Sequence, residues 1–87
     1  MDTQLSNSSC IGSLWEGTTV INSNLTGANL THASFRGANL SGTNLSFSIL
    51  KNADLSGANL TKVSFKQAVM SGLNRQGVNL SMGGVVG

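Results

Sequence analysis

The fold is decided by residues 25–60, which read LTGANLTHASFRGANLSGTNLSFSILKNADLSGANL. A large apolar residue recurs there at every fifth position, and a small residue, most often Ala, stands two places before it. Asn or Asp usually separates the two, while Ser, Thr or a basic residue follows, and then often Gly. An α-helix needs an apolar period of 3.6 and a flat strand a period of 2, so a period of five predicts a different element.

Five residues can form one short extended side and one corner, and four such sides close a coil of about twenty residues. Successive coils then stack about 4.8 Å apart, with backbone hydrogen bonds along the axis. The narrow interior requires one small and one large side chain per side. The period assigns these residues to the large interior position: Leu25, Leu30, Phe35, Leu40, Leu45, Leu50, Leu55, Leu60, Phe65, Met70 and Leu80.

Four units show the repeat most clearly: Ala28-Asn29-Leu30-Thr31, Ala38-Asn39-Leu40-Ser41-Gly42, Ala53-Asp54-Leu55-Ser56-Gly57 and Ala58-Asn59-Leu60-Thr61. They resemble the A-[DN]-L-x-x signature of the pentapeptide-repeat family, over about residues 20 to 82. The resemblance implies an all-β fold, the right-handed quadrilateral β-helix (pentapeptide-repeat solenoid), with about three to four coils. It also implies a mostly bacterial family, mostly without known enzymatic activity, in which some members mimic DNA and bind DNA gyrase and others are parts of secreted effectors.

The repeat divides the chain into three parts. Residues 20–82 are expected to form the β-helix and residues 83–87 a C-terminal tail. Residues 1–19 follow the frame loosely and are expected to form an irregular N-terminal coil or a cap. Their large positions hold Leu5, Cys10 and Trp15, followed by Val20 at the start of the regular part.

Two further departures from the repeat pattern lie near its C-terminal end. Arg75 occupies a large interior position and Leu73 a small one, which predicts a local distortion in which Leu73 supplies the apolar group and Arg75 points outward. Residues 81–87 contain no polar helix that would cover a last coil. An uncovered coil predicts end-to-end association as a homodimer, or a chain that is a fragment of a longer protein.

The ionisable residues do not assemble a catalytic or metal-binding set. The 87-residue chain has three acids, one His and one Cys, which supply neither paired carboxylates nor a nucleophile beside a base. We therefore predict no enzymatic activity, no cofactor, no bound metal and no small-molecule substrate. His32 is expected at an outward corner as a solvated side chain, and Cys10 in the interior as an inert thiol.

The candidate interaction residues are outward ones. Phe47 stands at an outward position that most units give to Gly, Asn or Lys, so it is a candidate contact residue. The outward basic residues are expected to be spread around the coil, with Lys66 and Lys51 on neighbouring sides; they are Arg36, Lys51, Lys62 and Lys66. The net charge is +2, and such a spread favours solubility over a nucleic-acid interface.

These observations favour a non-enzymatic protein–protein interaction or structural module, part of a larger bacterial protein or effector, with a protein partner that the sequence does not identify. One alternative is a DNA-mimicking protein that binds gyrase or another topoisomerase, which the basic charge disfavours. Another is an ice-binding β-helix, whose Thr array is broken by Lys51 and Lys66 in the columns Thr26-Ser46-Lys66 and Thr31-Lys51-Ser71. No apolar run could span a membrane, and the first residues lack a classical signal, so we expect a cytoplasmic location, with export by a specialised bacterial system as the alternative.

Overall fold

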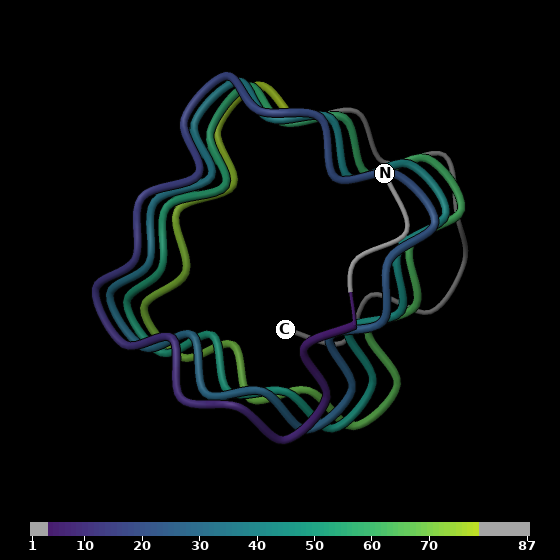
Figure 1. Cartoon of the computed structure of the whole chain (residues 1–87). Helices are drawn as coiled ribbons and strands as arrows, with labels where there is room; N and C mark the ends of the chain where they lie inside the picture. Colours follow the sequence, from purple (N-terminus) through teal and green to yellow (C-terminus); the bar gives the residue numbers. More distant parts are fainter. Residues whose placement is uncertain (1–3, 79–87) are drawn as a thin grey trace.

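A computed structural model of the chain describes residues 4–78, which wind into a regular four-sided coil (Figure 1). Parallel β-bridges join residues that are twenty apart, one every five residues, from Gln4↔Asn24 to Asp54↔Asn74. Each bridge involves a single residue on either coil, and residues 4–78 contain no helix and no longer strand. The same residues therefore include no helix that could cross a bilayer. Four bridges per twenty-residue turn define a β-helix.

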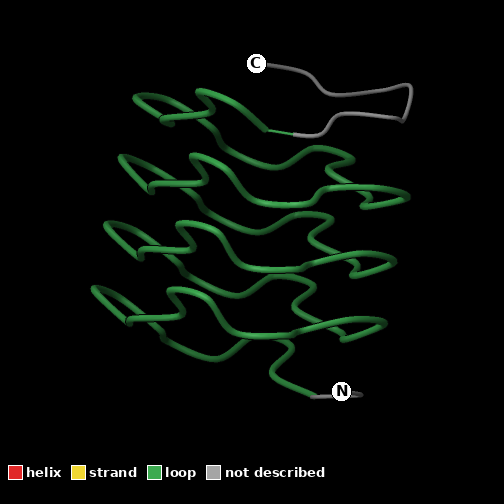
Figure 2. Ribbon diagram, turned by 90° about the horizontal axis from the view of Figure 1, so that it is seen from above, coloured by secondary structure: helices red, strands yellow, loops and turns green. Residues whose placement is uncertain are grey.

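Successive coils stack on one another (Figure 2), and a continuous ladder of backbone hydrogen bonds holds them together. The Leu25 N–H donates to the Asn44 C=O of the next coil at 2.9 Å, and the Asn44 N–H donates back to the Ser23 C=O at 2.9 Å. The same alternation recurs on each side of the coil. The backbone polar groups at the bridges are thus paired between coils, although each extended segment is very short.

Every corner of the coil is a tight turn that begins at the large interior residue. In one of them the Ala28 N–H donates to the Leu25 C=O at 3.1 Å, across Thr26 and Gly27. The third residue of the turn has a positive φ at all fifteen corners between Asn7 and Gly77, as a type II turn requires. Eight of these residues are Gly, which explains why Gly recurs two places after the large residue.

The Asn or Asp of each repeat caps the turn that follows it. The Asn24 Oδ1 accepts a hydrogen bond from the Thr26 N–H at 3.0 Å. An equivalent bond is made by Asn29, Asn39, Asn44, Asp54, Asn59 and Asn74. This Asx turn gives the backbone N–H at the corner a partner, which is why a carboxamide or carboxylate recurs at this position, here called the middle position.

The large and small positions together form the core. The buried large residues are Val20, Leu25, Leu30, Phe35, Leu40, Leu45, Leu50, Leu55, Leu60, Phe65 and Met70. Ala28, Ala33, Ala38, Ala53 and Ala58 are buried at the small position. Leu80, predicted for the same interior, lies outside the described residues. The buried side-chain nitrogen and oxygen atoms of the described residues all have hydrogen-bond partners.

The coil geometry begins before residue 20. Gln4, Ser9, Leu14 and Thr19 make the same bridges to the next coil as later residues do. What differs is packing: Leu5, Cys10 and Trp15 are only partly buried against the core, and Trp15 stacks on Phe35 with ring centroids 5.5 Å apart. Residues 4–19 therefore have a regular backbone with a partly open interior. The predicted tail, residues 83–87, lies outside the described residues.

The backbone around Arg75 keeps the register of the repeat. The Leu55 N–H donates to the Asn74 C=O at 2.7 Å, and the Gly57 N–H donates to the Gln76 C=O at 2.9 Å. The predicted local distortion is therefore wrong, because these bonds depend on backbone atoms and not on the interior side chain. Arg75 is exposed, and Leu73 is half-buried against the core.

Candidate interaction surface

Residues twenty apart stack on one another, so each side of the coil presents its own set of outward side chains. Two sides differ strongly in character. The side that we call acidic, after Glu16 and Asp54, comprises residues 14–17, 34–37, 54–57 and 74–77 and also carries Arg36 and Arg75. The apolar–basic side comprises residues 6–12, 26–32, 46–52 and 66–72.

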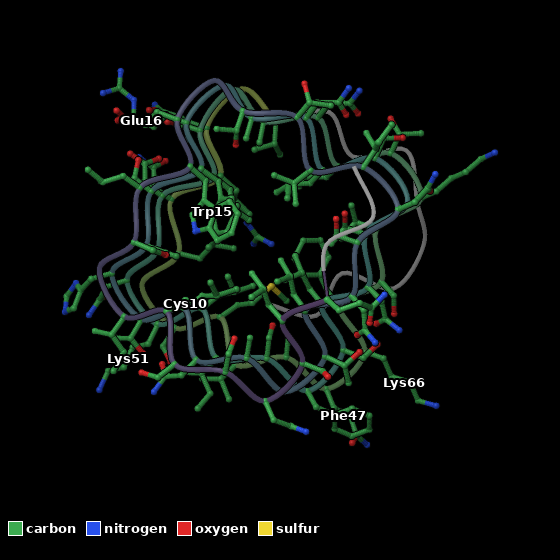
Figure 3. The ribbon with its side chains drawn as sticks, in the orientation of Figure 1. Cys10, Trp15, Glu16, Phe47, Lys51 and Lys66 are labelled. Atoms are coloured by element: carbon green, nitrogen blue, oxygen red, sulfur yellow. The ribbon has the colours of Figure 1, made fainter. Side chains whose placement is uncertain are left out.

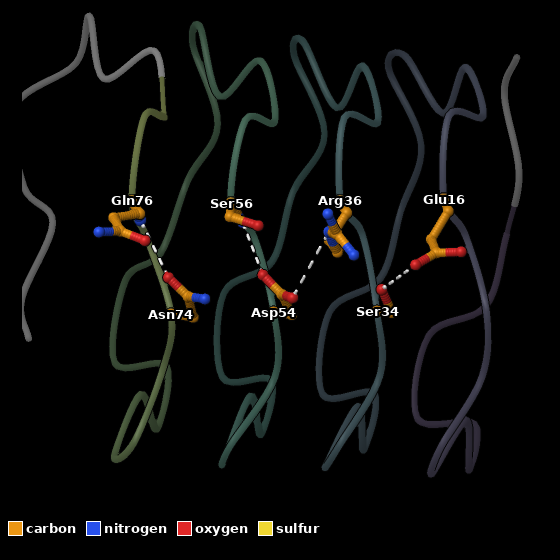
Figure 4. Close-up of polar contacts among 7 residues, drawn as sticks. All are labelled: Glu16, Ser34, Arg36, Asp54, Ser56, Asn74 and Gln76. Carbon is orange, nitrogen blue, oxygen red and sulfur yellow. Dashed lines mark hydrogen bonds and ion pairs between the residues drawn. The ribbon is translucent and has the colours of Figure 1, made fainter.

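The acidic side carries a polar network that crosses several coils (Figure 4). The Ser34 hydroxyl donates to the Glu16 carboxylate at 3.2 Å. Arg36 Nε lies 3.9 Å from Asp54 Oδ2, the one ion pair found within residues 4–78. Glu16 and Arg36, with Gly37, Ser56 and Gly57, line a shallow depression of about 490 Å³. Both charged groups that line it thus have a partner, Ser34 for Glu16 and Asp54 for Arg36.

Asp54 is held in its charged form by this environment. Its pKa lies below the ordinary value because the Ser56 hydroxyl donates a hydrogen bond to the carboxylate, and the Ser56 backbone N–H donates another. Partial desolvation opposes this effect, and the attraction of Arg36 adds to it. Asp54 therefore acts as a capping carboxylate with an ordinary structural role, and a proton donor at neutral pH would need the opposite shift.

The ionisable side chains of residues 4–78 are not gathered into one cluster. Among residues 4–78 no three His, Cys, Asp or Glu side chains gather closely enough to hold a metal ion. Arg36 stands in the coil between Glu16 and Asp54, so the two carboxylates are not neighbours. What this side can offer a ligand is a shallow polar surface.

The apolar–basic side presents exposed apolar residues between two cations (Figure 3). Phe47 is 53% exposed, and Ile49 and Val69 are 36% and 46% exposed. A parallel bridge pairs Ile49 with Val69. Lys66 adjoins Phe47 at one corner, where the Phe47 N–H donates to the Lys66 C=O at 2.8 Å, and Lys51 projects from the other corner.

The structure brings some of the predicted interaction residues together and separates others. Phe47, Lys51 and Lys66 share the apolar–basic side, so the two lysines bound one side where the sequence had suggested neighbouring sides. Arg36 is on the acidic side, and Lys62 lies at another corner. His32 is exposed beside Lys51, to whose C=O its N–H donates at 2.9 Å.

Sequence reasoning missed Ile49 and Val69 as surface residues. Both stand at the middle position, where Asn or Asp caps seven of the fifteen turns in residues 4–78. An aliphatic residue at the middle position was the signal in the sequence that could have indicated an exposed apolar side chain. Since the middle position points outward between two inward ones, such a residue must be exposed.

Comparisons with known proteins define the family to which the chain belongs. The profile described as Pentapeptide repeats matches in eight copies, over residues 1–37, 16–46 and 48–81. The chain belongs to the pentapeptide-repeat family. Proteins of this family form right-handed quadrilateral β-helices and are generally non-enzymatic.

Several solved structures are similar to this chain. Rfr23, a pentapeptide repeat protein of the cyanobacterium Cyanothece 51142, is 32% identical with a TM-score of 0.80, over 83% of this chain and 50% of that one. The pentapeptide repeat protein alr5209 of Nostoc Pcc 7120 is 33% identical with a TM-score of 0.48, over 83% of this chain and 64% of that one. QnrB1, a plasmid-mediated fluoroquinolone resistance protein, is 26% identical with a TM-score of 0.46, over 86% of this chain and 39% of that one.

The chain thus spans about half to two thirds of the length of the first two structures. Among curated protein sequences, none matches it.

Proposed function

We propose that this chain is a non-enzymatic module that binds a protein partner through the outer surface of a right-handed β-helix, within a larger bacterial protein or effector. The observation that carries the proposal is that most positions of the repeat unit have a structural role in the coil. The buried large and small positions fill the coil, and the Asn, Asp and Gly positions build its corners. Only the remaining outward side chains are available for recognition.

The outward surface has features that suit a protein partner. Five large apolar side chains of the described residues are exposed, and most of them lie on one side of the coil. Exposed apolar groups that gather in one place are typical of surfaces that bind other macromolecules. The matched region covers half of Rfr23, which supports a role as one part of a larger solenoid.

A role as a DNA mimic receives less support. Such a protein needs a strongly acidic surface to imitate phosphates. This chain has three acids against five basic residues, and Asp54 is paired with Arg36. We expect no inhibition of DNA gyrase in a supercoiling assay, and inhibition at submicromolar protein would favour the DNA-mimic alternative.

The proposed function is tested by crosslinking in the native host. A photoreactive amino acid is placed, one position at a time, at Glu16, Arg36, Phe47 or Lys62, so that several sides are sampled. We expect irradiation to join the chain to a discrete protein from at least one of these positions. If no position yields a crosslinked protein, while each variant retains the circular dichroism of the unmodified chain, the proposed function is wrong.

A further inference from the structure

Exposed apolar side chains concentrate on the apolar–basic side. Of the five large ones exposed among residues 4–78, Ile11, Phe47, Ile49 and Val69 are on this side, and Leu14 is on the acidic side. Ile49 and Val69 are bridged, and Phe47 lies two residues before Ile49, with the buried Ser48 between them. Phe47, Ile49 and Val69 therefore form one continuous surface over two coils, here called the apolar patch.

Phe47, Ile49 and Val69 do not stabilise the coil at the positions that they occupy. Phe47 has a φ of 61°, a conformation that strains a bulky side chain, and it is too exposed for burial to offset that strain. Ile49 and Val69 stand where Asn or Asp caps the turn in other units, and an aliphatic side chain cannot accept the hydrogen bond. Three adjacent replacements, each unfavourable for the coil, point to a use outside it.

The apolar patch lies between two cations without partners in the fold. Lys51 and Lys66 stand at the two corners of this side, and neither forms an ion pair within the described residues. The acids of residues 4–78, Glu16 and Asp54, both lie on the acidic side. The field above the patch is therefore positive, and no acid of residues 4–78 neutralises it.

We propose that the apolar–basic side binds an acidic segment of a partner protein. Apolar residues of that segment cover Phe47, Ile49 and Val69, and Asp or Glu residues on either side of them pair with Lys51 and Lys66. An apolar centre with a charged rim is the usual arrangement of a protein interface, and the rim charges select the partner. This inference rests on the proposed function and names the partner class for it.

Other occupants fit these observations less well. Recognition of an anionic membrane typically takes clusters of about four to eight basic residues, and this side offers Lys51 and Lys66. Nucleic-acid binding likewise gathers many cations on one face. A second copy of the chain that used the same side would bring lysines against lysines, since a two-fold interface is self-complementary.

The test is selection of peptides from a random library displayed on phage, with the full chain as the target. We expect the enriched peptides to combine Asp or Glu with aromatic or aliphatic residues. Their affinities are then measured by fluorescence anisotropy with synthetic copies of the enriched sequences. Vesicles containing phosphatidylserine are assayed in parallel by co-sedimentation.

Two sets of variants locate the binding. The triple variant Phe47→Gly, Ile49→Asn and Val69→Asn introduces residues that the repeat uses at the equivalent positions elsewhere, so it retains the fold. We expect it to weaken peptide binding by at least about tenfold. The pair Lys51→Glu and Lys66→Glu should weaken binding to a similar extent and remove most of its salt dependence.

Control substitutions are placed on other sides of the coil. Leu14→Asn removes a side chain that is 78% exposed at the middle position of the acidic side. Lys62→Glu reverses a charge at another corner. Both controls should bind the peptides with affinities within about twofold of the unmodified chain.

Several results would overturn the inference. They are the absence of enriched peptides, enrichment of peptides without acids, and equal binding to the triple variant and to Leu14→Asn. Binding to vesicles that depends on Phe47, without peptide binding, would assign the side to a membrane. If crosslinks in the native host persist from other positions, only this inference is lost; if none forms from any position, the proposed function is lost as well.

Discussion

At the scale of single residues, stability is set by how well each side chain suits its place in a five-residue unit. Seven of the fifteen corner residues with positive φ are not Gly, and they include Lys62 with a φ of 59°. The left-handed conformation disfavours side chains with a Cβ atom, most of all large ones. A large side chain at such a corner therefore lowers the free energy of unfolding, and its replacement by Gly should raise it.

Replacing Lys62 by Gly should raise the free energy of unfolding by about 0.5–1 kcal/mol, because relief of the strained φ exceeds the entropy cost of Gly. Urea unfolding followed by circular dichroism measures the change. Lys66→Gly is the control: Lys66 lies at a corner position without positive φ, so this change should lower stability by about 0.5–1 kcal/mol. A loss of stability with Lys62→Gly would show that the side chain of Lys62 contributes more than its backbone strain costs.

A second prediction at this scale concerns the carboxylate of Asp54. Its pKa is lower in the folded chain than in the unfolded one, so its contribution to stability is present above the unfolded pKa. That contribution is lost as the pH falls through the folded pKa, below the ordinary value of 3.8. Asp54→Asn keeps a capping carbonyl, as in Asn59, and removes the titration.

We therefore expect the unmodified chain to lose more stability than Asp54→Asn between about pH 7 and about pH 3. The measurement is the urea midpoint at each pH. Glu16→Gln is the control, since it removes another carboxylate of the same side. Equal acid sensitivity of the Asp54→Asn variant and the unmodified chain would contradict the assignment of Asp54 as a stabilising carboxylate.

At the scale of elements, the corner residues of neighbouring coils constrain one another. Wherever Asn occupies a left-handed corner, at Asn7, Asn22 and Asn52, the residue twenty places later is Gly. A Cβ atom built on Gly42 would lie 2.2 Å from Asn22 Oδ1. The Asn side chain thus occupies the space above its own corner, and the next coil must leave that space free.

Gly42→Ala should therefore destabilise the chain more than Gly37→Ala. Both changes place Ala at a positive φ, at a common cost of about 1–2 kcal/mol, but a Cβ on Gly37 meets nothing within 4 Å. Thermal unfolding of the two variants measures the difference. Adding Asn22→Gly to Gly42→Ala should remove the additional loss of stability. If it does not, the Asn22 side chain is not the cause of that loss.

Hydroxyl groups at the small position show a second kind of contact between coils. The buried Thr43 hydroxyl donates to the Val20 C=O and accepts from the Ser23 N–H, so it joins two backbone groups of the preceding coil. The buried Ser48 hydroxyl donates to the Leu45 C=O, which also accepts the Ser48 N–H. Only the first hydroxyl links two coils.

Thr43→Ala should accordingly cost about 1–3 kcal/mol of the free energy of unfolding, because it leaves buried backbone groups without this partner. Ser48→Ala should change it by less than about 0.5 kcal/mol, since Ala is the commonest residue at this position. Chemical denaturation measures both. Equal effects of the two substitutions would contradict the role of Thr43 between coils.

At the scale of the whole molecule, each coil contacts only the coils next to it, and the core is a single column of side chains along the axis. Leu50 is fully buried in this column, and its neighbour Ile49 is an outward residue of the apolar patch. Adjacent residues thus serve the core and the surface separately. Substitution of one or the other should separate stability from binding.

Leu50→Ala should cost about 2–5 kcal/mol through the cavity that it leaves, a large share of the stability of a small domain. Ile49→Asn should leave stability unchanged or raise it, because Asn at the middle position can cap the turn. Urea unfolding measures both, and peptide binding should be weakened by Ile49→Asn. Similar losses of stability from the two substitutions would mean that Ile49 belongs to the core.

The sequence by itself determined the interior, because a five-residue period is a local pattern: it assigns Leu30, Leu50 and Leu60 to the same inward position of their units. It also predicted the roles of Asn and Gly, since turn chemistry depends on neighbours in the chain. Only the tertiary structure decided which outward residues share a side and with whom they pair. The regular backbone of residues 4–19, the pairing of Arg36 with Asp54, and the bridge that joins Ile49 to Val69 all depend on contacts between coils, which no local pattern specifies.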